Sequence, residues 1–317
     1  MFRPGGENRC NQEVSSVMAG VKEYRVFDVT LAHKVLLTPS LIACVLQGEA
    51  VKEMKICAPD QRIKVLLPAE DGTPSSLPPT GEWYKLAQAL PKAQRPIART
   101  YTLRALDTER GEMTVEFVAH GTEGPASAWA LGAEPGARLQ VVAPRGDYAG
   151  DNGGYEWVQS ALTRQVLLMG DETALPAIKS ILEQLARQDN PPQVQAFIEV
   201  PLQADCTDDY RTLPFAEVVW LPREGTGATY GERLLEAARH WSCPTAQAVS
   251  HPVTVEDIAE GEKVWQPASA QQGQFFGWVA AESSAVKALR RYLLAEKGGA
   301  QDAITFMAYW SRGPRPH

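Results

Sequence analysis

The chain has 317 residues, of which 44% are hydrophobic and 22% charged, and its 31 basic and 38 acidic side chains give a formal net charge of −7. This composition is typical of a globular protein and excludes a disordered chain. The acidic balance disfavours a nucleic-acid-binding protein, which usually has a basic surplus, but it allows a local basic pocket. At roughly 150 residues per domain, the length predicts about two domains.

Neither a membrane span nor a disulfide framework is indicated. The longest apolar runs, such as Val166–Met169, have the length of a strand, whereas a bilayer span needs about 20 residues. The segment Met1–Gly20 lacks the apolar middle of a signal peptide. The five cysteines are an odd number without a CxxC pair, which favours free thiols over disulfides or a metal cluster. We therefore expect a cytoplasmic protein with no membrane partner.

The first half of the chain has strand signals. After an N-terminal arm over 1–20, short strands are predicted at Val26–Val29, Ile63–Leu67, Thr100–Leu106, Met113–Val118 and Arg138–Ala143. The turn-rich segments between them, such as the loop Asp71–Gly81, are typical of a β-barrel or sandwich. We therefore predict an antiparallel barrel domain over 21–155.

In the second half, strands and helices alternate. Strands are predicted at Val166–Met169, Gln195–Val200, Glu217–Leu221, Gln274–Ala280 and Ile304–Trp310, and helices at Ala174–Arg187, Gly231–His240 and Ser283–Glu296. This alternation predicts an α/β domain with a parallel sheet over 156–317. The polar segment Ser242–Pro267 is expected to be a long loop or small insertion. A barrel followed by such a domain is the architecture of ferredoxin-reductase-like flavoproteins.

Two motifs of the first half suit a flavin. The run Arg99–Thr102 (R-T-Y-T) combines a cation, an aromatic ring and hydroxyls on one strand. Alternation places Arg99 and Tyr101 on one face, and Thr100 and Thr102 on the other. The turn after His120 has Gly and small residues before a helical segment, where backbone N–H groups can bind a pyrophosphate. Its Ser127 either adds a hydroxyl to that site or caps the helix.

The second half has three further motifs. Gly170–Pro176 follows the first parallel strand, where nucleotides bind in open sheets, although it lacks the GxGxxG pattern. The basic helix after Glu282 provides either an anion site or a solvated face. Tyr309 and Trp310 end the last strand and either cover a flavin ring or belong to the core.

Taken in order, these motifs resemble the siderophore-interacting protein family, the flavin-dependent ferric-siderophore reductases, over about Tyr24–Gly313. The resemblance depends on R-T-Y-T at 99–102, H-G-x-x-G-P-A-S-x-W-A at 120–130, G-D-E-T-A-L-P at 170–176, A-E-S-S at 281–284 and Y-W-S-R-G at 309–313. Two positions depart from the family pattern. Ala128 stands where a basic residue is common beside the Trp, and Ala281 where Gly is common before the Glu.

The resemblance implies bound FAD and a donor that is NADPH, NADH or ferredoxin. The implied cofactor-binding residues are Arg99, Thr100, Tyr101, Thr102, Glu116, Val118, His120, Gly121, Gly124, Ala126, Ser127, Trp129, Asp171, Thr173, Ala174, Pro176, Glu282, Tyr309 and Trp310. The basic pocket for an anionic ferric siderophore would consist of Lys64, Lys287, Arg290 and Arg291. No catalytic side chain and no protein ligand to a metal is implied, and we expect a monomer.

The residues leave the donor and the function partly open. Arg223, just past a predicted strand, could bind the 2′-phosphate of NADPH, whereas Glu199, near the end of the preceding strand, could bind the ribose hydroxyl of NADH. Arg223 favours NADPH as the predicted donor. Two alternative functions are a ferredoxin-reductase-like flavoprotein that passes electrons to or from a protein partner, and a non-catalytic siderophore-binding protein.

Overall fold

The computed structural model describes residues 23–119, 124–244, 255–258, 262–269, 273–299 and 301–313. The expected arm over 1–20 and the candidate residues His120 and Gly121 lie outside these ranges. The chain forms two compact units, which we call the barrel unit and the α/β unit. The barrel unit ends at Gly154, and Leu36–Leu41 and Ala58–Asp60 group with the α/β unit.

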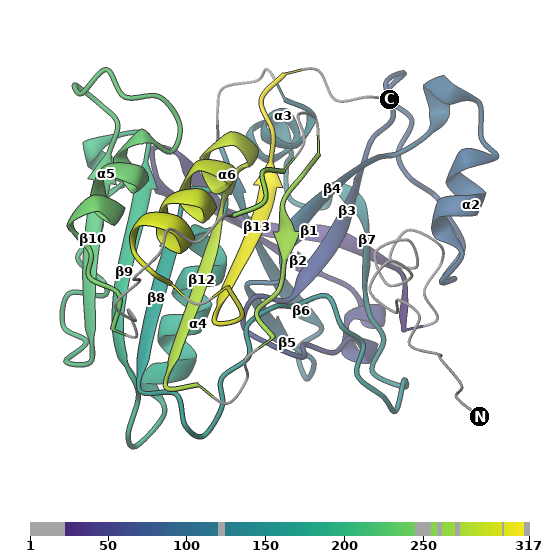
Figure 1. The fold of residues 1–317 in the computed structure, drawn as a ribbon. Helices are drawn as coiled ribbons and strands as arrows, with labels where there is room; N and C mark the ends of the chain where they lie inside the picture. Colours follow the sequence, from purple (N-terminus) through teal and green to yellow (C-terminus); the bar gives the residue numbers. More distant parts are fainter. Residues whose placement is uncertain are drawn as a thin grey trace, which may run out of the picture. The chain divides into compact units, whose positions relative to one another are not determined.

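The barrel unit is built on a seven-stranded sheet in the order β4-β3-β7-β1-β2-β6-β5 (Figure 1). Its strands are β1 (Tyr24–Thr38), β2 (Leu41–Gln47), β3 (Arg62–Leu67), β4 (Ile97–Thr102), β5 (Ala105–Asp107), β6 (Glu112–Val118) and β7 (Arg138–Pro144). The pairs β1–β7, β3–β7, β3–β4 and β5–β6 are antiparallel. The predicted antiparallel architecture is confirmed.

Apolar side chains cover both faces of this sheet. Alternate strand residues, among them Phe27, Val65 and Phe117, form the main core, and helix α3 (Pro125–Gly132) adds Ala126 and Ala130 to it. On the opposite face, Leu66 and Val142 pack with Ala87 of helix α2 (Trp83–Gln88). Successive residues of these strands point to opposite faces of the sheet, and both faces carry buried side chains.

The predicted strand Thr100–Leu106 is wrong in its extent, because it is broken between β4 and β5. The Leu103 N–H donates to the Gln61 carbonyl (2.7 Å) and the Arg104 N–H to the Thr114 carbonyl (3.0 Å). At this point the chain leaves β3 and joins β6. Strand β2 and helix α2 are absent from the sequence-based prediction.

The α/β unit has a six-stranded sheet in the order β10-β9-β8-β12-β13-β11. Its strands are β8 (Gln165–Gly170), β9 (Gln193–Val200), β10 (Ala216–Pro222), β11 (Trp265–Gln266), β12 (Phe275–Glu282) and β13 (Ile304–Trp310). Five strands are parallel, as predicted. The short β11 runs antiparallel to β13, so the sheet is mixed at this edge. Part of the segment expected to be a loop or insertion therefore forms a strand.

Helices cover both faces of this sheet. Figure 1 shows α5 (Glu232–His240) and α6 (Ser283–Arg291) on one face and α4 (Leu175–Ala186) on the other. A π-helical turn over Tyr292–Glu296 extends α6. Strands β9 and β10 lie on one side of β8, and β12 and β13 on the other. The strand order therefore reverses between β8 and β12, and ligands of open parallel sheets bind outside the carboxyl ends at such a switch point.

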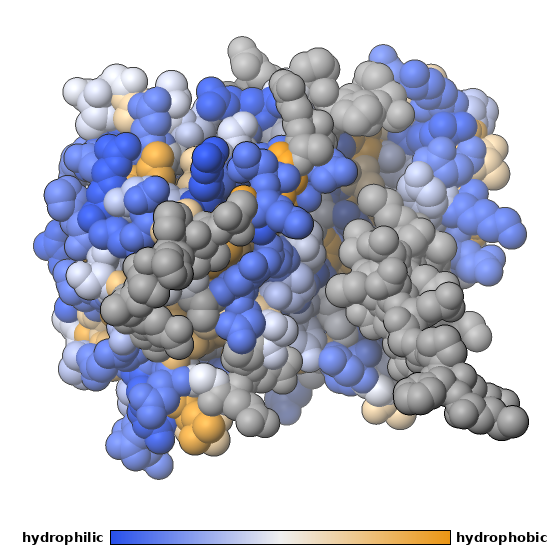
Figure 2. Space-filling model, viewed as in Figure 1, coloured by the Kyte–Doolittle hydropathy of each residue, from blue (hydrophilic) through white to orange (hydrophobic). Residues whose placement is uncertain are grey.

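One face of the molecule is largely polar, as expected for a chain with buried apolar cores. The face drawn in Figure 2 is mostly hydrophilic, with scattered hydrophobic residues. In the part of the chain that the structure describes, no helix is both long and apolar enough to cross a membrane.

The turn that ends the barrel unit makes one glycine irreplaceable. Gly153 and Gly154 both have positive φ (65° and 77°). A Cβ on Gly154 would overlap the Tyr24 hydroxyl, whereas one on Gly153 would meet no described atom within 4 Å. We expect Gly153→Ala to cost about 1–2 kcal/mol through backbone strain alone. Gly154→Ala should cost more, because the Tyr24–Gln61 hydrogen bond (2.8 Å) must also shift.

Urea unfolding of the two variants measures this difference. Equal losses of stability in the two proteins would contradict the steric explanation.

Candidate functional site

In the barrel unit, strand β4 presents the expected flavin residues on two faces. Tyr101 packs against the main core. On the opposite face, the Lys64 Nζ donates to the Thr100 Oγ1 at 2.5 Å. Arg99 thus shares a face with Tyr101, and the buried Thr102 shares one with Thr100, as the alternation predicts. Lys64 belongs to the face that is turned away from the Tyr101 ring.

An aromatic row runs inward from Tyr101. The centroids of the Tyr101 and Phe117 rings are 4.7 Å apart. The centroids of the Phe117 ring and the Trp129 ring of α3 are 5.8 Å apart. Phe117 is fully buried, whereas Tyr101 and Trp129 are half-buried, as is the neighbouring Val118. The Tyr101 ring is therefore supported from behind and remains partly accessible, which suits an apolar surface for a planar ligand.

The start of α3 has no described side chain packed against its first glycine. Gly124 is the N-cap residue, no side chain among the described residues caps the helix, and the first turn holds no acidic residue. A Cβ on Gly124 would meet no described atom within 4 Å. Backbone N–H groups at such a helix start favour an anion. Ala126 and Ser127 follow there and are buried.

Glu116 has a partner within the barrel unit. Its carboxylate is 2% exposed and lies 2.9 Å from the Arg104 Nε. Because the guanidinium neutralises this buried carboxylate, we interpret Glu116 as a residue that orders β6 against the β4–β5 connection.

In the α/β unit, Asp171 joins the carboxyl ends of three strands. It follows β8 directly. Its Oδ2 accepts hydrogen bonds from the Glu282 N–H of β12 (2.9 Å) and from the Trp310 Nε1 of β13 (2.8 Å). Its Oδ1 accepts from the Thr173 N–H (3.0 Å) and hydroxyl (2.5 Å). With 1% exposure, the carboxylate holds the switch point together from within.

The environment of Asp171 changes its acidity. Burial, and then the charge of Glu172, raise the pKa of the Asp171 carboxyl from 3.8 to about 7, although hydrogen bonds from Thr173 and Trp310 lower it. Both oxygens already accept hydrogen bonds from protein donors. We therefore interpret Asp171 as a residue that positions its neighbours.

The turn after β8 also fixes the start of α4. A Cβ on Gly170 would come within 2.7 Å of the Ala174 Cβ, so the close approach of turn and strand requires glycine. Ala174 and Pro176 are buried, and Thr173 is half-buried. Among the candidate residues of this turn, Thr173 is therefore the one with a side chain that a ligand can reach.

Glu282 is the N-cap of α6. Its Oε2 accepts hydrogen bonds from the Ser284 and Ala285 N–H groups (2.9 and 3.2 Å), which satisfies the first turn of the helix. The carboxylate is 2% exposed. The expected nucleotide residue Glu282 therefore has a structural role at the switch point.

Arg223 and Glu199 are partners of each other. The Arg223 Nη1 donates to the Glu199 Oε1 at 2.7 Å, and the guanidinium also holds Glu172 in a bidentate pair. Glu199 has no exposed surface, and it accepts further hydrogen bonds from the N–H groups of Gly231 and Leu234 at the start of α5. The interpretation of Glu199 as a ribose ligand is therefore wrong.

The terminal aromatic residues are held by other side chains. The Tyr309 ring is stacked on Trp265 (6.3 Å between centroids, 15° between planes) and lies edge-on to Trp278 (5.9 Å). The Trp310 ring is edge-on to Tyr230 (4.8 Å). Tyr309 is therefore part of the aromatic packing of the α/β unit.

The three cations of α6 have different environments. Arg290 is 7% exposed, and its guanidinium donates to the Gln266 Oε1 (2.8 Å) and to the Glu256 carbonyl (3.0 Å). It clamps the segment before β12 and is withdrawn from the candidate siderophore pocket. Arg291 is exposed, with its Nη1 3.7 Å from the Asp257 Oδ1, and Lys287 is half-buried.

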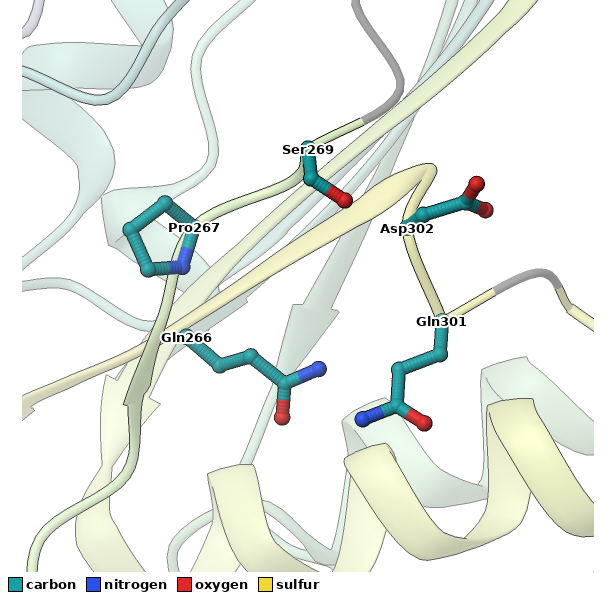
Figure 3. Close-up of a pocket in the computed structure, with 5 residues that line it drawn as sticks. All are labelled: Gln266, Pro267, Ser269, Gln301 and Asp302. Atoms are coloured by element: carbon teal, nitrogen blue, oxygen red, sulfur yellow. The ribbon is translucent and has the colours of Figure 1, made fainter. Parts of the chain in front are cut away.

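Near this clamp lies an open surface hollow of about 460 Å³ (Figure 3). Its lining consists of Gln266, Pro267, Ser269, Gln301 and Asp302. None of these residues is among the sequence-derived candidates, and none provides a positive charge. The hollow therefore does not suit an anionic chelate.

Sequence reasoning missed several partners. Glu172, Tyr230 and Arg104 were not singled out, although each contacts a residue that was considered. The contacts of these residues join segments that are distant in the chain, and a single sequence does not reveal such contacts. The register pairs Ala105 with Thr114, so Arg104 is not directly opposite Glu116 and cross-strand pairing alone would not have suggested their ion pair.

Comparison with known proteins shows which sequences this chain is similar to. A sequence model of the siderophore-interacting FAD-binding domain matches residues 30–148, and a model of the siderophore-interacting protein matches residues 163–313. An uncharacterized protein of Mycobacterium tuberculosis is 34% identical over 229 residues, which cover 71% of this chain and 68% of the relative. The NADPH-dependent ferric-chelate reductase of Escherichia coli is 27% identical over 294 residues, covering 91% of this chain and 94% of the relative.

A crystal structure of a siderophore utilization protein from T. fusca has the same fold. Its TM-score is 0.64 at 24% identity, and the match covers 92% of this chain and 95% of that chain.

The raised pKa of Asp171 predicts a pH-dependent stability. A carboxyl with a raised pKa binds its proton more tightly in the folded than in the unfolded state. Protonation between about pH 7 and pH 4 therefore stabilises the fold, by at most about 1.4 kcal/mol per pH unit. Asp171→Asn cannot titrate. We expect the stability of the wild type relative to this variant to increase as the pH falls through this window.

Urea unfolding of both proteins at several pH values between about 5 and 8 measures the effect. Parallel stability curves would show that Asp171 does not titrate in this range.

Proposed function

Because the chain belongs to the siderophore-interacting protein family, we propose that it is an FAD-dependent reductase of ferric siderophores that takes electrons from a nicotinamide nucleotide. One observation carries this proposal. A single chain joins the family's FAD-binding domain to a parallel sheet with a nucleotide-type switch point. We assign FAD to the barrel unit and the donor to the carboxyl ends of β8 and β12.

The barrel unit has side chains and backbone groups that suit FAD. Tyr101 has a half-buried ring, and Arg99 places a positive charge on the same strand face. The uncapped start of α3 at Gly124 suits a pyrophosphate. When bound, FAD would accept two electrons from the nicotinamide and release them singly to iron(III).

In iron release, the role of the protein is to attract the ferric chelate. Hard oxygen ligands hold iron(III) more tightly than iron(II), so reduction loosens the metal without a protein ligand. We assign the attraction of the anionic chelate to individual cations of each unit: Lys64 in the barrel unit, and Lys287 and Arg291 in the α/β unit, each taken as a separate candidate. In a chain with a net charge of −7, such local cations both orient and concentrate an anion.

Reconstitution tests the function. The purified protein should bind FAD and form iron(II) from a ferric siderophore when given NADH or NADPH, with the product trapped by an iron(II) chelator. Reduced ferredoxin should be tested beside the nucleotides. A protein that binds no FAD would overturn the proposal, and one that binds the siderophore without turnover would be a binding protein.

Charge reversal tests the chelate site. We expect Lys64→Glu and Arg291→Glu to raise the KM for an anionic ferric siderophore roughly five- to tenfold, because attraction becomes repulsion, while the KM for the nucleotide stays unchanged. Lys52→Glu is the control, since Lys52 is an exposed lysine of the barrel unit that pairs with Glu49. Equal effects at all three positions would reduce the result to net charge and contradict the assignment to Lys64 and Arg291.

A further inference from the structure

We infer that Glu172 and Glu199 withhold Arg223 from phosphate, and that the donor site therefore selects NADH over NADPH, with Glu172 as the specificity-determining residue. This inference rests on the proposed function and names its donor. It reverses the preference that Arg223 alone suggests in the sequence.

The geometry leaves little of Arg223 for a ligand. Its Nη2 lies 2.7 Å from the Glu172 Oε1, and its Nη1 lies 3.1 Å from the Glu172 Oε2 and 2.7 Å from the Glu199 Oε1. The exposed fractions of the three side chains are 10%, 3% and 0% for Arg223, Glu172 and Glu199. Bidentate pairs of this kind are strong and directional.

One face of the guanidinium contacts an aromatic ring. The Arg223 Cζ lies 4.5 Å from the centroid of the Tyr230 ring, and the Arg312 Cζ lies 5.1 Å from the same centroid. Two carboxylates and an aromatic ring thus contact the guanidinium of Arg223.

The buried ion-pair cluster itself carries a negative charge. Within it, two carboxylates against the one guanidinium of Arg223 leave a net charge of −1, and the exposed Arg312 beside Tyr230 is a cation outside this cluster. A phosphate monoester such as the 2′-phosphate adds nearly two negative charges at neutral pH. NADH lacks this group and avoids the repulsion.

Recruiting Arg223 to a 2′-phosphate would break a buried ion pair. Glu172 would then remain buried without its partner, which is strongly unfavourable. Although burial lowers the pKa of Arg223, the hydrogen bonds and charges of Glu172 and then Glu199 raise it above its ordinary value, so the guanidinium stays charged and committed.

Glu172 is the better residue to change. Glu199 also accepts hydrogen bonds from the Gly231, Arg233 and Leu234 N–H groups at the start of α5, so its substitution would disturb the fold. Glu172→Gln keeps the size of the side chain and removes the charge. The matched control is Glu224→Gln, which removes an exposed carboxylate next to Arg223 that accepts from the Gln203 N–H.

The experiment compares nucleotides that differ in the 2′-phosphate alone. For the wild type we expect kcat/KM with NADH to exceed that with NADPH by at least about tenfold, and calorimetry to show tighter binding of 5′-AMP than of 2′,5′-ADP. Glu172→Gln should raise kcat/KM for NADPH and the affinity for 2′,5′-ADP by about tenfold, with the NADH values within about twofold. The double variant E172Q/R223Q should lose this gain.

Several results would overturn the inference: a wild-type preference for NADPH, an equal gain in Glu224→Gln, or no binding of either adenosine nucleotide. A second experiment uses dithionite as the reductant in place of a nucleotide, and it tests the reductase function independently of the nucleotide preference. If FAD-loaded protein reduced by dithionite forms iron(II) from the chelate while NADPH is the preferred donor, the inference fails and the reductase function stands. If the dithionite arm fails, the reductase function fails, and the adenosine nucleotides still decide the role of Glu172.

Discussion

The α/β unit depends on one buried carboxylate. Asp171 ties the ends of β8, β12 and β13 through the Glu282 N–H and the Trp310 indole. Parallel strands end here with unpaired backbone groups and helix starts, and an internal acceptor is needed where no water can reach. Because this acceptor is desolvated, its charged form is stable only with several donors. The residues around it are therefore held in position by the protein itself.

The same principle recurs elsewhere in the α/β unit. Glu282 accepts from the start of α6, Glu199 from the start of α5, and Asp60 from the Trp278 indole and two backbone N–H groups. In each case a buried carboxylate compensates a group that the fold leaves unsatisfied. Among the described residues, these buried acids place several carboxylates in the interior of the α/β unit, each of them held by donors of the protein.

Local patterns predicted the parts of the fold that depend on neighbouring residues. The strand, glycine turn and helix from β8 to α4 were recognisable because hydrophobic periodicity and Gly170 lie within one short segment. Strand β11 was not recognisable from the sequence, because its two residues form a strand only through pairing with β13, about 40 residues away. The break before β5 also depends on a distant partner, the Gln61 carbonyl.

The candidate site shows the same limit. The types of residue were predictable, because an arginine and an acid near strand ends suggest a nucleotide. Their roles were not, because Arg223, Glu199 and Glu172 bind one another across three strands. Similarly, Arg290 was indistinguishable from Arg291 on a basic helix until Gln266 was placed beside it.

An anaerobic titration of the FAD-loaded protein, followed by visible absorption, tests the proposed electron transfer most directly. The flavin band should bleach on addition of NADH and return on addition of a ferric siderophore, with two iron(II) formed per FAD. A flavin that bleaches but stays bleached in the presence of the ferric siderophore would contradict the proposed transfer.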